Sequence, residues 1–206
     1  MRPAGFTIRR TLSLGLAGLA LLGTAGCIRF GAKPPEKLLT IASEARITDG
    51  KALTSASTDA LYIELPGVPR SLATQRIAVR TSDNSYAYVQ KALWVDMPAR
   101  QFQSLLSETI SARTGRLVLD PAHYPAQVGH VLHGELIAFG ADASANQAVV
   151  TYDVSMLAAD GTTMTRQRFS AHRPLGKIDA DSVAPAISAA ANEVAAAVAD
   201  WVKALK

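Results

Sequence analysis

The chain has 206 residues and a formal net charge of +4, with 49% hydrophobic and 18% charged residues. This length fits one domain, or one domain with a tail. Of the 21 basic residues, three lie within residues 1–26, which are expected to be removed, so the mature chain keeps 18 basic against 17 acidic residues. A nearly neutral chain lacks the basic surface that nucleic-acid binding requires, and this balance argues against a nucleic-acid partner.

The first 26 residues have the layout of an export signal. A basic stretch, Met1 to Arg10, precedes an apolar run from Thr11 to Leu22, and small residues follow. These are the three parts of a secretory signal peptide. Because a membrane-spanning helix needs about 20 apolar residues, the run is too short for a permanent anchor. The Arg9-Arg10-Thr11-Leu12 stretch also resembles a twin-arginine signal, which leaves a second export route open.

The end of this signal, Leu22-Gly23-Thr24-Ala25-Gly26-Cys27, contains the only cysteine of the chain. It resembles the bacterial lipobox, in which the cysteine is lipidated before the signal is cut. The resemblance implies cleavage between Gly26 and Cys27, with diacylglycerol and an N-acyl chain carried on Cys27. More than one acyl chain makes membrane anchoring stable. The alternative is a chance cysteine behind an ordinary signal.

Residues 27–37 are expected to form a flexible tether. The segment contains Gly31 and the polar, helix-breaking run Lys33-Pro34-Pro35-Glu36-Lys37. Cys27 is followed by isoleucine rather than aspartate. By analogy with enterobacterial sorting, this favours the periplasmic face of the outer membrane over the inner membrane.

The first half of the mature chain predicts strands at residues 38–41, 60–65, 75–80 and 86–95. The last two form a hairpin, because turn-forming residues 82–85 separate them. Pro98 is suited to the first position of a helix, and Gly115 to its end. Between them, an apolar stripe recurs at helical spacing. It consists of Phe102, Leu105, Leu106, Thr109 and Ile110.

The second half predicts strands at residues 116–119, 128–140, 147–157 and 163–171. Apolar and polar residues alternate along 147–157, which is typical of a sheet covered on one face only. Asp160-Gly161 indicates a two-residue hairpin turn. A helix is expected over residues 181–205, with Pro185 in its first turn and a buried stripe of Ile187, Ala191, Val194, Val198, Trp201 or Val202, and Leu205.

This order of elements predicts an α+β fold for residues 38–206. We expect a two-layer sandwich in which two amphipathic helices cover one face of a mostly antiparallel sheet. The opposite face of the sheet is expected to be polar.

The sequence gives little indication of catalysis. It contains neither a glycine-rich phosphate-binding loop nor a G-x-S-x-G nucleophile elbow. His130 and His133 are three apart on an expected strand, so they point to opposite faces and cannot share a metal ion. Acidic residues such as Glu64, Glu135 and Asp153 are scattered, and we expect them to lie on a solvated surface. The sequence therefore predicts a protein that is not an enzyme and holds no metal or other cofactor.

Three aromatic residues and one arginine are candidates for contact with a partner protein. Tyr86, Tyr88 and Trp94 lie on the expected hairpin, where exposed aromatic side chains can anchor a partner. Arg70 follows the loop Pro66-Gly67-Val68-Pro69. Two alternatives remain: Trp94 packs against the first helix, and Arg70 holds its own loop by binding carbonyl groups.

The run PGVPRSLATQRIAVRTSDNSYAYVQKALWVDMPARQFQSLLSETI, residues 66–110, resembles the auxiliary lipoproteins of bacterial ABC-type transport systems, the family that includes paraquat-inducible protein C. The resemblance implies a non-enzymatic envelope protein that works with an MCE-domain protein and an ABC permease and ATPase complex in lipid transport between membranes. Two alternatives are a lipid- or small-molecule-binding envelope lipoprotein and an outer-membrane assembly lipoprotein. An anchored hydrolase is a third.

Overall fold

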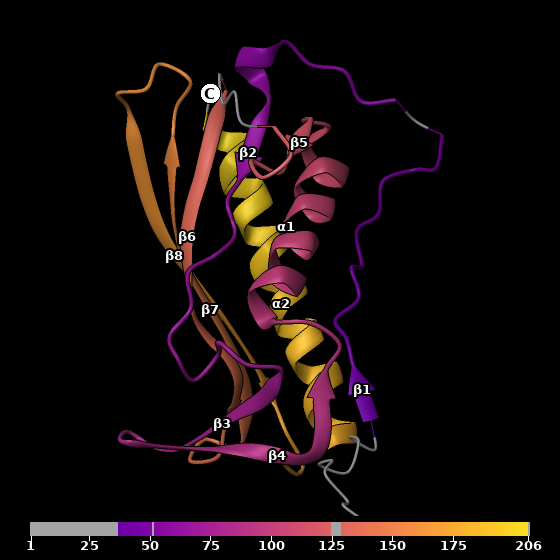
Figure 1. The fold of residues 1–206 in the computed structure, drawn as a ribbon, viewed down its shortest axis with the longest axis vertical. Coiled ribbons are helices and arrows are strands. Elements are labelled where there is room, and N and C mark those ends of the chain that lie inside the picture. The colour runs from indigo at the N-terminus through magenta and orange to yellow at the C-terminus, as the bar shows by residue number, and fades with distance from the viewer. Residues whose placement is uncertain (1–36, 51, 125–128, 206) are drawn as a thin grey trace, which may run out of the picture. The chain divides into compact units, whose positions relative to one another are not determined.

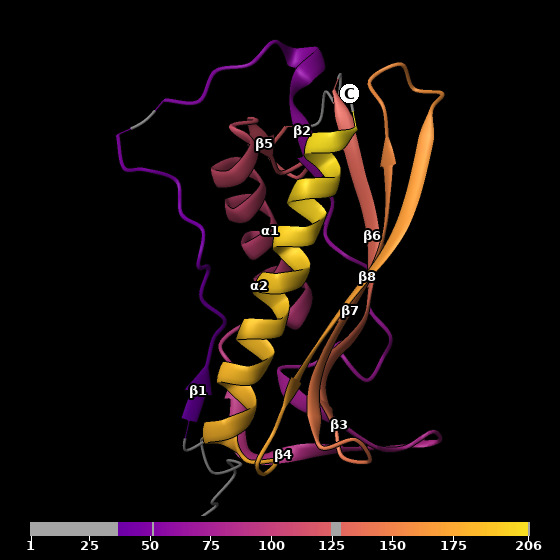
Figure 2. The same ribbon diagram turned by 180° about the vertical axis from the view of Figure 1, so that it is seen from behind.

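The computed structural model describes residues 37–50, 52–124 and 129–205. The expected signal peptide, its cleavage point at Gly26 and Cys27, and the tether up to residue 36 lie outside these residues. Within them, a mixed sheet of eight strands carries two helices on one of its faces (Figure 1). Seen from behind, the two helices run side by side over the sheet (Figure 2).

The elements follow one another in the order that the sequence predicts. They are β1 (Lys37–Leu39), a 3-10 turn (Ser57–Asp59), β2 (Leu61–Ile63), β3 (Arg76–Ser82), β4 (Ser85–Trp94), α1 (Pro98–Thr114), β5 (Val118–Leu119), β6 (His130–Asp142), β7 (Gln147–Leu157), β8 (Met164–Pro174) and α2 (Ala180–Ala204).

The centre of the sheet is β6, which has a different set of partners on each edge. On one edge it pairs with β7 along its length, and β7 pairs in turn with β8, both antiparallel. On the other edge, β2 and β3 pair in parallel with opposite ends of β6. An isolated bridge between Gly67 and Glu135 lies between these two contacts. The chain from β2 to β3 therefore follows one edge of β6, with a loop between Gly67 and β3.

The β3–β4 hairpin is bent by an irregularity in β4. Arg76 pairs with Leu93, whereas Ala78 pairs with Tyr88, so β4 has extra residues at this point. Lys91 lies there with a φ of 60°, a value that residues other than glycine rarely adopt. A bulge of this kind bends the strand and changes which face its side chains take. After it, β4 pairs in parallel with β1.

Both helices begin and end as their sequences indicate. Pro98 occupies the start of α1, and Gly115 ends it with a φ of 71°, where its N–H donates to the Ser111 carbonyl. Asp179 caps α2 by accepting a hydrogen bond from the Ser182 N–H at 3.0 Å. Since α2 begins at Ala180, Pro185 lies in its second turn. The prediction that Pro185 lies in the first turn is therefore wrong.

The core lies between the helices and the inner face of the sheet. The predicted stripe of α1 is fully buried, as are Ile187, Ala191, Val194, Val198 and Val202 of α2. In β7, alternate residues from Ala148 to Met156 are buried against the helices. The α+β sandwich is thereby confirmed, with the long strand pairs antiparallel and the short pairs that involve β1, β2 and β3 parallel.

The connection between β7 and β8 is longer than the two-residue turn expected from Asp160-Gly161. Leu157 pairs with Met164, and the Ala158 N–H donates to the Thr163 carbonyl. The Asp160 carboxylate accepts hydrogen bonds from the backbone N–H groups of Thr162 and Thr163, both at 2.8 Å. These bonds stabilise a wider loop, in which Gly161 has a φ of 68°.

Residues 40–47 form a strap that runs along α1 and α2 and is hydrogen-bonded to both helices. Its backbone is held by polar helix side chains rather than by another strand. The Gln101 Oε1 accepts from the Ile41 N–H at 3.2 Å, and Asn192 accepts from the Glu44 N–H at 2.9 Å and donates to the Ala42 carbonyl at 2.8 Å. The strap therefore fastens the start of the domain to α1 and α2.

By length and composition, α2 is apolar enough to cross a membrane, but a core helix of a folded domain meets the same criteria. Here 56% of its most apolar stretch is buried within the domain. Its apolar character is therefore accounted for by packing on α1 and the sheet.

Candidate docking face

The sheet face opposite the helices, here named the outer face, carries most of the polar side chains of the strands. Strand alternation and the pairing register define its members. They are Tyr62, Glu64, Ala78, Arg80, Tyr86 and Tyr88 on the β2–β4 side, Val131, His133, Glu135, Ala138, Gly140 and Asp142 of β6, Gln147, Val149, Thr151, Asp153, Ser155 and Leu157 of β7, and Met164, Arg166, Arg168, Ser170 and His172 of β8. Most of this face is polar, as expected, but at one end Tyr62 and Val131 are buried in a small apolar cluster with Leu157.

A groove of about 320 Å³ lies on the outer face where β3, β4, β6 and β7 meet. Its lining residues are Ser71, Leu72, Ala78, Arg80, Tyr86, Ile137, Ala138, Phe139, Gly140, Ala141, Asp142, Gln147, Val149, Thr151 and His172. A Cβ on Gly140 would lie 2.2 Å from the Ala78 carbonyl oxygen, so only glycine lets β3 approach β6 this closely. The groove therefore combines a floor of small residues with charged and aromatic groups.

One wall of the groove is an ion pair between Arg80 of β3 and Asp142 of β6. The Asp142 carboxylate also accepts hydrogen bonds from the Ser144 N–H at 3.0 Å and the Ser144 hydroxyl at 2.6 Å. Together, the Arg80 guanidinium and these Ser144 donors lower the pKa of Asp142 to about 2. The wall therefore carries a fixed charge pair at neutral pH.

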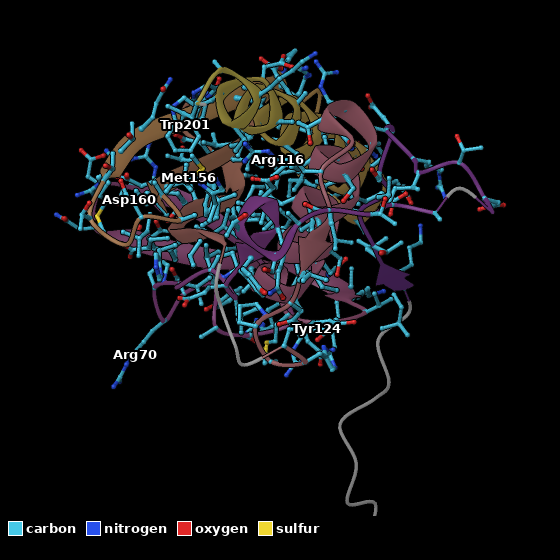
Figure 3. The ribbon with its side chains drawn as sticks, turned by 90° about the horizontal axis from the view of Figure 1, so that it is seen from above. Arg70, Arg116, Tyr124, Met156, Asp160 and Trp201 are labelled. Carbon is cyan, nitrogen blue, oxygen red and sulfur yellow. The ribbon has the colours of Figure 1, made fainter. Side chains whose placement is uncertain are left out.

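Tyr86 and Tyr88 lie beside this groove, and Arg70 belongs to the loop next to it. Tyr86 lines it and is 53% exposed. The Arg76 guanidinium lies 4.0 Å from the centre of the Tyr88 ring, and the Tyr88 hydroxyl lies 3.5 Å from the Ser71 carbonyl oxygen. Arg70 directly precedes Ser71, and its side chain extends away from the domain into solvent (Figure 3). Three of the four predicted partner-contact residues thus belong to one surface.

Trp94 does not reach this surface. It is fully buried, and its ring lies 5.5 Å from that of Phe139 between the sheet and the helices. Phe139 in turn contacts Phe102 of α1. The irregularity at Lys91 turns the end of β4 so that Trp94 faces inward while Tyr86 and Tyr88 face outward. The hypothesis that Trp94 contacts a partner is therefore corrected, because a fully buried ring offers no surface to a partner.

An arginine cluster on β8 was missed by sequence reasoning, which placed Asp153 on a solvated surface. Asp153 is only 7% exposed. Its carboxylate accepts from Arg166 at 2.8 and 2.9 Å and from Arg168 at 2.6 and 3.1 Å. These two guanidinium groups hold the pKa of Asp153 far below its usual range. The only sign of the cluster in the sequence was Asp153 on one predicted strand and, on the next predicted strand, Arg166 and Arg168 two positions apart.

The Asp153 cluster predicts a loss of stability in acid. Because the pKa of Asp153 is lower in the folded chain than its value near 3.9 in an unfolded chain, the ionised carboxylate stabilises the fold above that pH and the contribution is lost as pH falls. We expect the stability difference between the wild type and Asp153→Asn to be constant above about pH 5 and to shrink below about pH 4. Urea unfolding across this pH range measures it, and a difference that stays constant down to pH 2 would contradict the role of this carboxylate.

The histidines lie apart, as their spacing predicted. The His133 Nδ1 lies 2.8 Å from Glu64 on the outer face, whereas the His130 Nδ1 is buried on the other face and has no hydrogen-bond partner among the described residues. Burial, together with the nearby charge of Arg116, lowers the pKa of His130. Within the part of the chain that the structure describes, no three His, Cys, Asp or Glu side chains are placed to hold a metal ion.

The groove contains hydroxyl groups and a histidine but shows no nucleophile and base in contact. Ser71, Thr151 and His172 all line it. The Thr151 hydroxyl accepts from Ser170 at 3.0 Å, and among the described residues no hydrogen bond joins His172 to either hydroxyl. Nucleophilic catalysis relies on a contact of this kind between a nucleophile and a base.

Comparison with known proteins shows the family to which the chain belongs. The model of the family described as the ABC-type transport auxiliary lipoprotein component matches residues 45–199. The chain belongs to this family, which confirms the resemblance noted for residues 66–110. No curated protein matches the chain.

Two solved structures share the fold. Protein XCC0632 from Xanthomonas campestris, assigned to the family model DUF330, is similar with a TM-score of 0.65 at 15% identity, over 82% of this chain and 95% of that one. The crystal structure of an uncharacterised protein has a TM-score of 0.62 at 18% identity, over 74% of this chain and 96% of that one. The PelC dodecamer from Paraburkholderia phytofirmans is more distant, with a TM-score of 0.41 at 13% identity, over 72% of this chain and 92% of that one.

Proposed function

We propose that this protein is a membrane-anchored, non-enzymatic component of an ABC/MCE-type system that moves lipid between membranes. The family match over residues 45–199 carries the proposal, because it makes the chain an auxiliary lipoprotein component of ABC-type transport. In the proposal, acylated Cys27 holds the domain at the periplasmic face of the outer membrane. The domain docks on an MCE-domain protein, which works with the permease and ATPase.

The outer face supports docking better than the helical side does. The strap of residues 40–47 runs along α1 and α2, whereas the groove is open and has a charged wall and an exposed tyrosine. Exposed tyrosine and arginine side chains beside a groove are the residue types that contribute most binding energy at protein interfaces. We therefore place the contact with the transport machinery at Tyr86, Tyr88 and Arg70.

Site-specific photocrosslinking in cells tests this placement. A photoreactive phenylalanine analogue in place of Tyr86 is expected to form an adduct with an MCE-domain or permease subunit, because the side chain stands at the edge of the groove. The matched control carries the same analogue at Ala112, an exposed position on α1. Adducts from Ala112 but none from Tyr86 would move the contact to the helices, and no adduct from either position would count against docking on such a system.

A lipid carrier that holds an acyl chain between the helices and the sheet is the main alternative. This space is filled by large side chains that are fully buried, including Trp94, Phe102, Phe139 and Tyr152. A bound chain would have to displace them, at the cost of the packing that stabilises the domain. Native mass spectrometry of the purified protein distinguishes the two functions, since a carrier retains non-covalent lipid and a docking subunit does not.

A further inference from the structure

The strand β8 forms a border of the sheet (Figures 1 and 2). It is 11 residues long, and within the described part of the chain it pairs with β7 alone. The pairing from Gln147–Pro174 to Leu157–Met164 is continuous, without a bulge. At such a border, the backbone N–H and C=O groups of every second residue point away from the sheet and can pair with another strand.

The side chains of β8 make this border positive. Its sequence, MTRQRFSAHRP, contains three arginines and no acidic residue. Arg173 pairs with Glu193 of α2, whereas Arg166 and Arg168 share the single carboxylate of Asp153. On the outer face, both arginines bind Asp153, and the carboxylate of Glu135, which lies opposite Asp153 on β6, also attracts Arg166.

The two arginines also keep free donors. Each uses its Nε and Nη2 on Asp153. A guanidinium has five N–H donors, and among the described residues the Nη1 group of neither arginine has a hydrogen-bond partner, so both groups can bind a second carboxylate. The side chains of Arg166 and Arg168 are 70% and 59% exposed, and so a ligand can reach them.

We propose that β8 binds an extended acidic segment of a partner protein, which adds to the sheet as one further strand. Backbone hydrogen bonds along the border hold the segment, as in other cases of strand addition. Aspartate or glutamate residues two apart in that segment lie on the outer face and bind the Nη1 groups of Arg166 and Arg168, because directly opposite side chains of paired strands are about 5 Å apart.

The charge of β8 argues against two other occupants. A second copy of β8 would bring arginines against arginines, and like charges opposite one another destabilise a strand pair. An anionic membrane surface could neutralise the arginines but offers no backbone to the unpaired groups of the border. Arg166 and Arg168 do not line the groove, although His172 of the same strand does, and the proposal does not depend on the transport role.

Fluorescence anisotropy with the full lipidated protein in detergent tests the proposal. The probe is a labelled peptide about as long as β8, in which glutamate alternates with valine. Three comparison peptides carry lysine for glutamate, N-methylated backbone at alternate positions, or glutamate and valine in scrambled order. We expect only the alternating glutamate peptide to bind well, and hydrogen exchange to show that it protects amides of β8.

Variants with opposite expected effects make the result specific. Arg166→Gln combined with Arg168→Gln is expected to weaken binding by about tenfold or more, since charge pairs across an interface contribute on this scale. Asp153→Asn is expected to strengthen it, because it removes the competing carboxylate. Arg173→Gln, on the inner side of the same strand, is the control and is expected to leave the affinity unchanged, and circular dichroism checks the fold of each variant.

Three results would overturn the proposal. The first is equal binding of the N-methylated peptide, which would mean attraction by charge without strand addition. The second is a protein that does not bind the peptide but binds vesicles of phosphatidylglycerol and phosphatidylcholine through Arg166 and Arg168. The third is self-association, detected by sedimentation, that the double arginine variant abolishes.

Discussion

Replacing Trp94 with alanine is expected to lower the free energy of unfolding by about 4 kcal/mol, the middle of the range for deleting a large buried aromatic side chain. Trp94 is fully buried and packs on Phe139, which itself contacts Phe102. Its removal leaves a cavity where the sheet meets α1. Urea unfolding followed by circular dichroism measures the loss.

Tyr86→Ala is the matched control, because Tyr86 lies on the same strand but is 53% exposed. Its effect on the free energy of unfolding is expected to be within about 0.5 kcal/mol, as for most surface substitutions. Partner binding is expected to show the reverse: Tyr86→Ala remains folded but binds its partner less well. A Trp94→Ala variant of unchanged stability that fails to bind its partner would restore Trp94 as a contact residue.

Gly134→Ala is expected to destabilise the domain by about 3 kcal/mol, at the upper end of the usual cost of overpacking a core. A Cβ at this position of β6 would lie 2.3 Å from ring atoms of Tyr152. Tyr152 is fully buried, and its ring lies 5.1 Å from that of Phe102, so it has no free space to move into. We expect a lower unfolding midpoint in both heat and urea.

Gly67→Ala separates this clash from the general effect of replacing a glycine beside β6. A Cβ on Gly67 would meet its nearest atom, the Gly134 carbonyl oxygen, at 3.8 Å, which is ordinary contact. The change is expected to alter the free energy of unfolding by less than about 1 kcal/mol. Equal effects of the two variants would show that the Tyr152 ring is not the constraint at Gly134.

The sequence predicted the elements in which buried side chains recur at a regular spacing. The period of two in β7 and the apolar stripe in α1 identify buried faces that the structure confirms at Val150 and Phe102. Pro98 and Gly115 marked the ends of α1 because their backbone preferences act locally. These features need no knowledge of distant contacts.

The sequence could not predict features that depend on an irregularity within a strand or on contacts between residues far apart in the chain. Simple alternation puts Tyr86, Tyr88 and Trp94 on one face, but the positive φ at Lys91 interrupts it. The arginine cluster needed the register that sets Asp153 opposite Arg168, and registers follow from the whole sheet. The strap likewise depends on Asn192, a helix residue 148 positions from Glu44.

The proposed anchor and the proposed docking face have separate places in the chain. In the proposal, the tether leads from acylated Cys27 to β1 and the strap, which hydrogen bonds fasten to α1 and α2. The outer face lies on the opposite side of the sheet from these helices and is left open. A domain attached through one side can present the other to a partner.

The chemical state of Cys27 decides both the proposed location and the proposed role, because both follow from a lipid anchor. Intact-mass spectrometry of the mature protein from its native membrane is expected to show a chain that begins at Cys27 and carries the mass of diacylglycerol and an N-acyl chain. Cys27→Ser is expected to leave the precursor uncut and without lipid. A wild-type mature chain that begins at another residue, with Cys27 removed or its thiol free, would contradict the account.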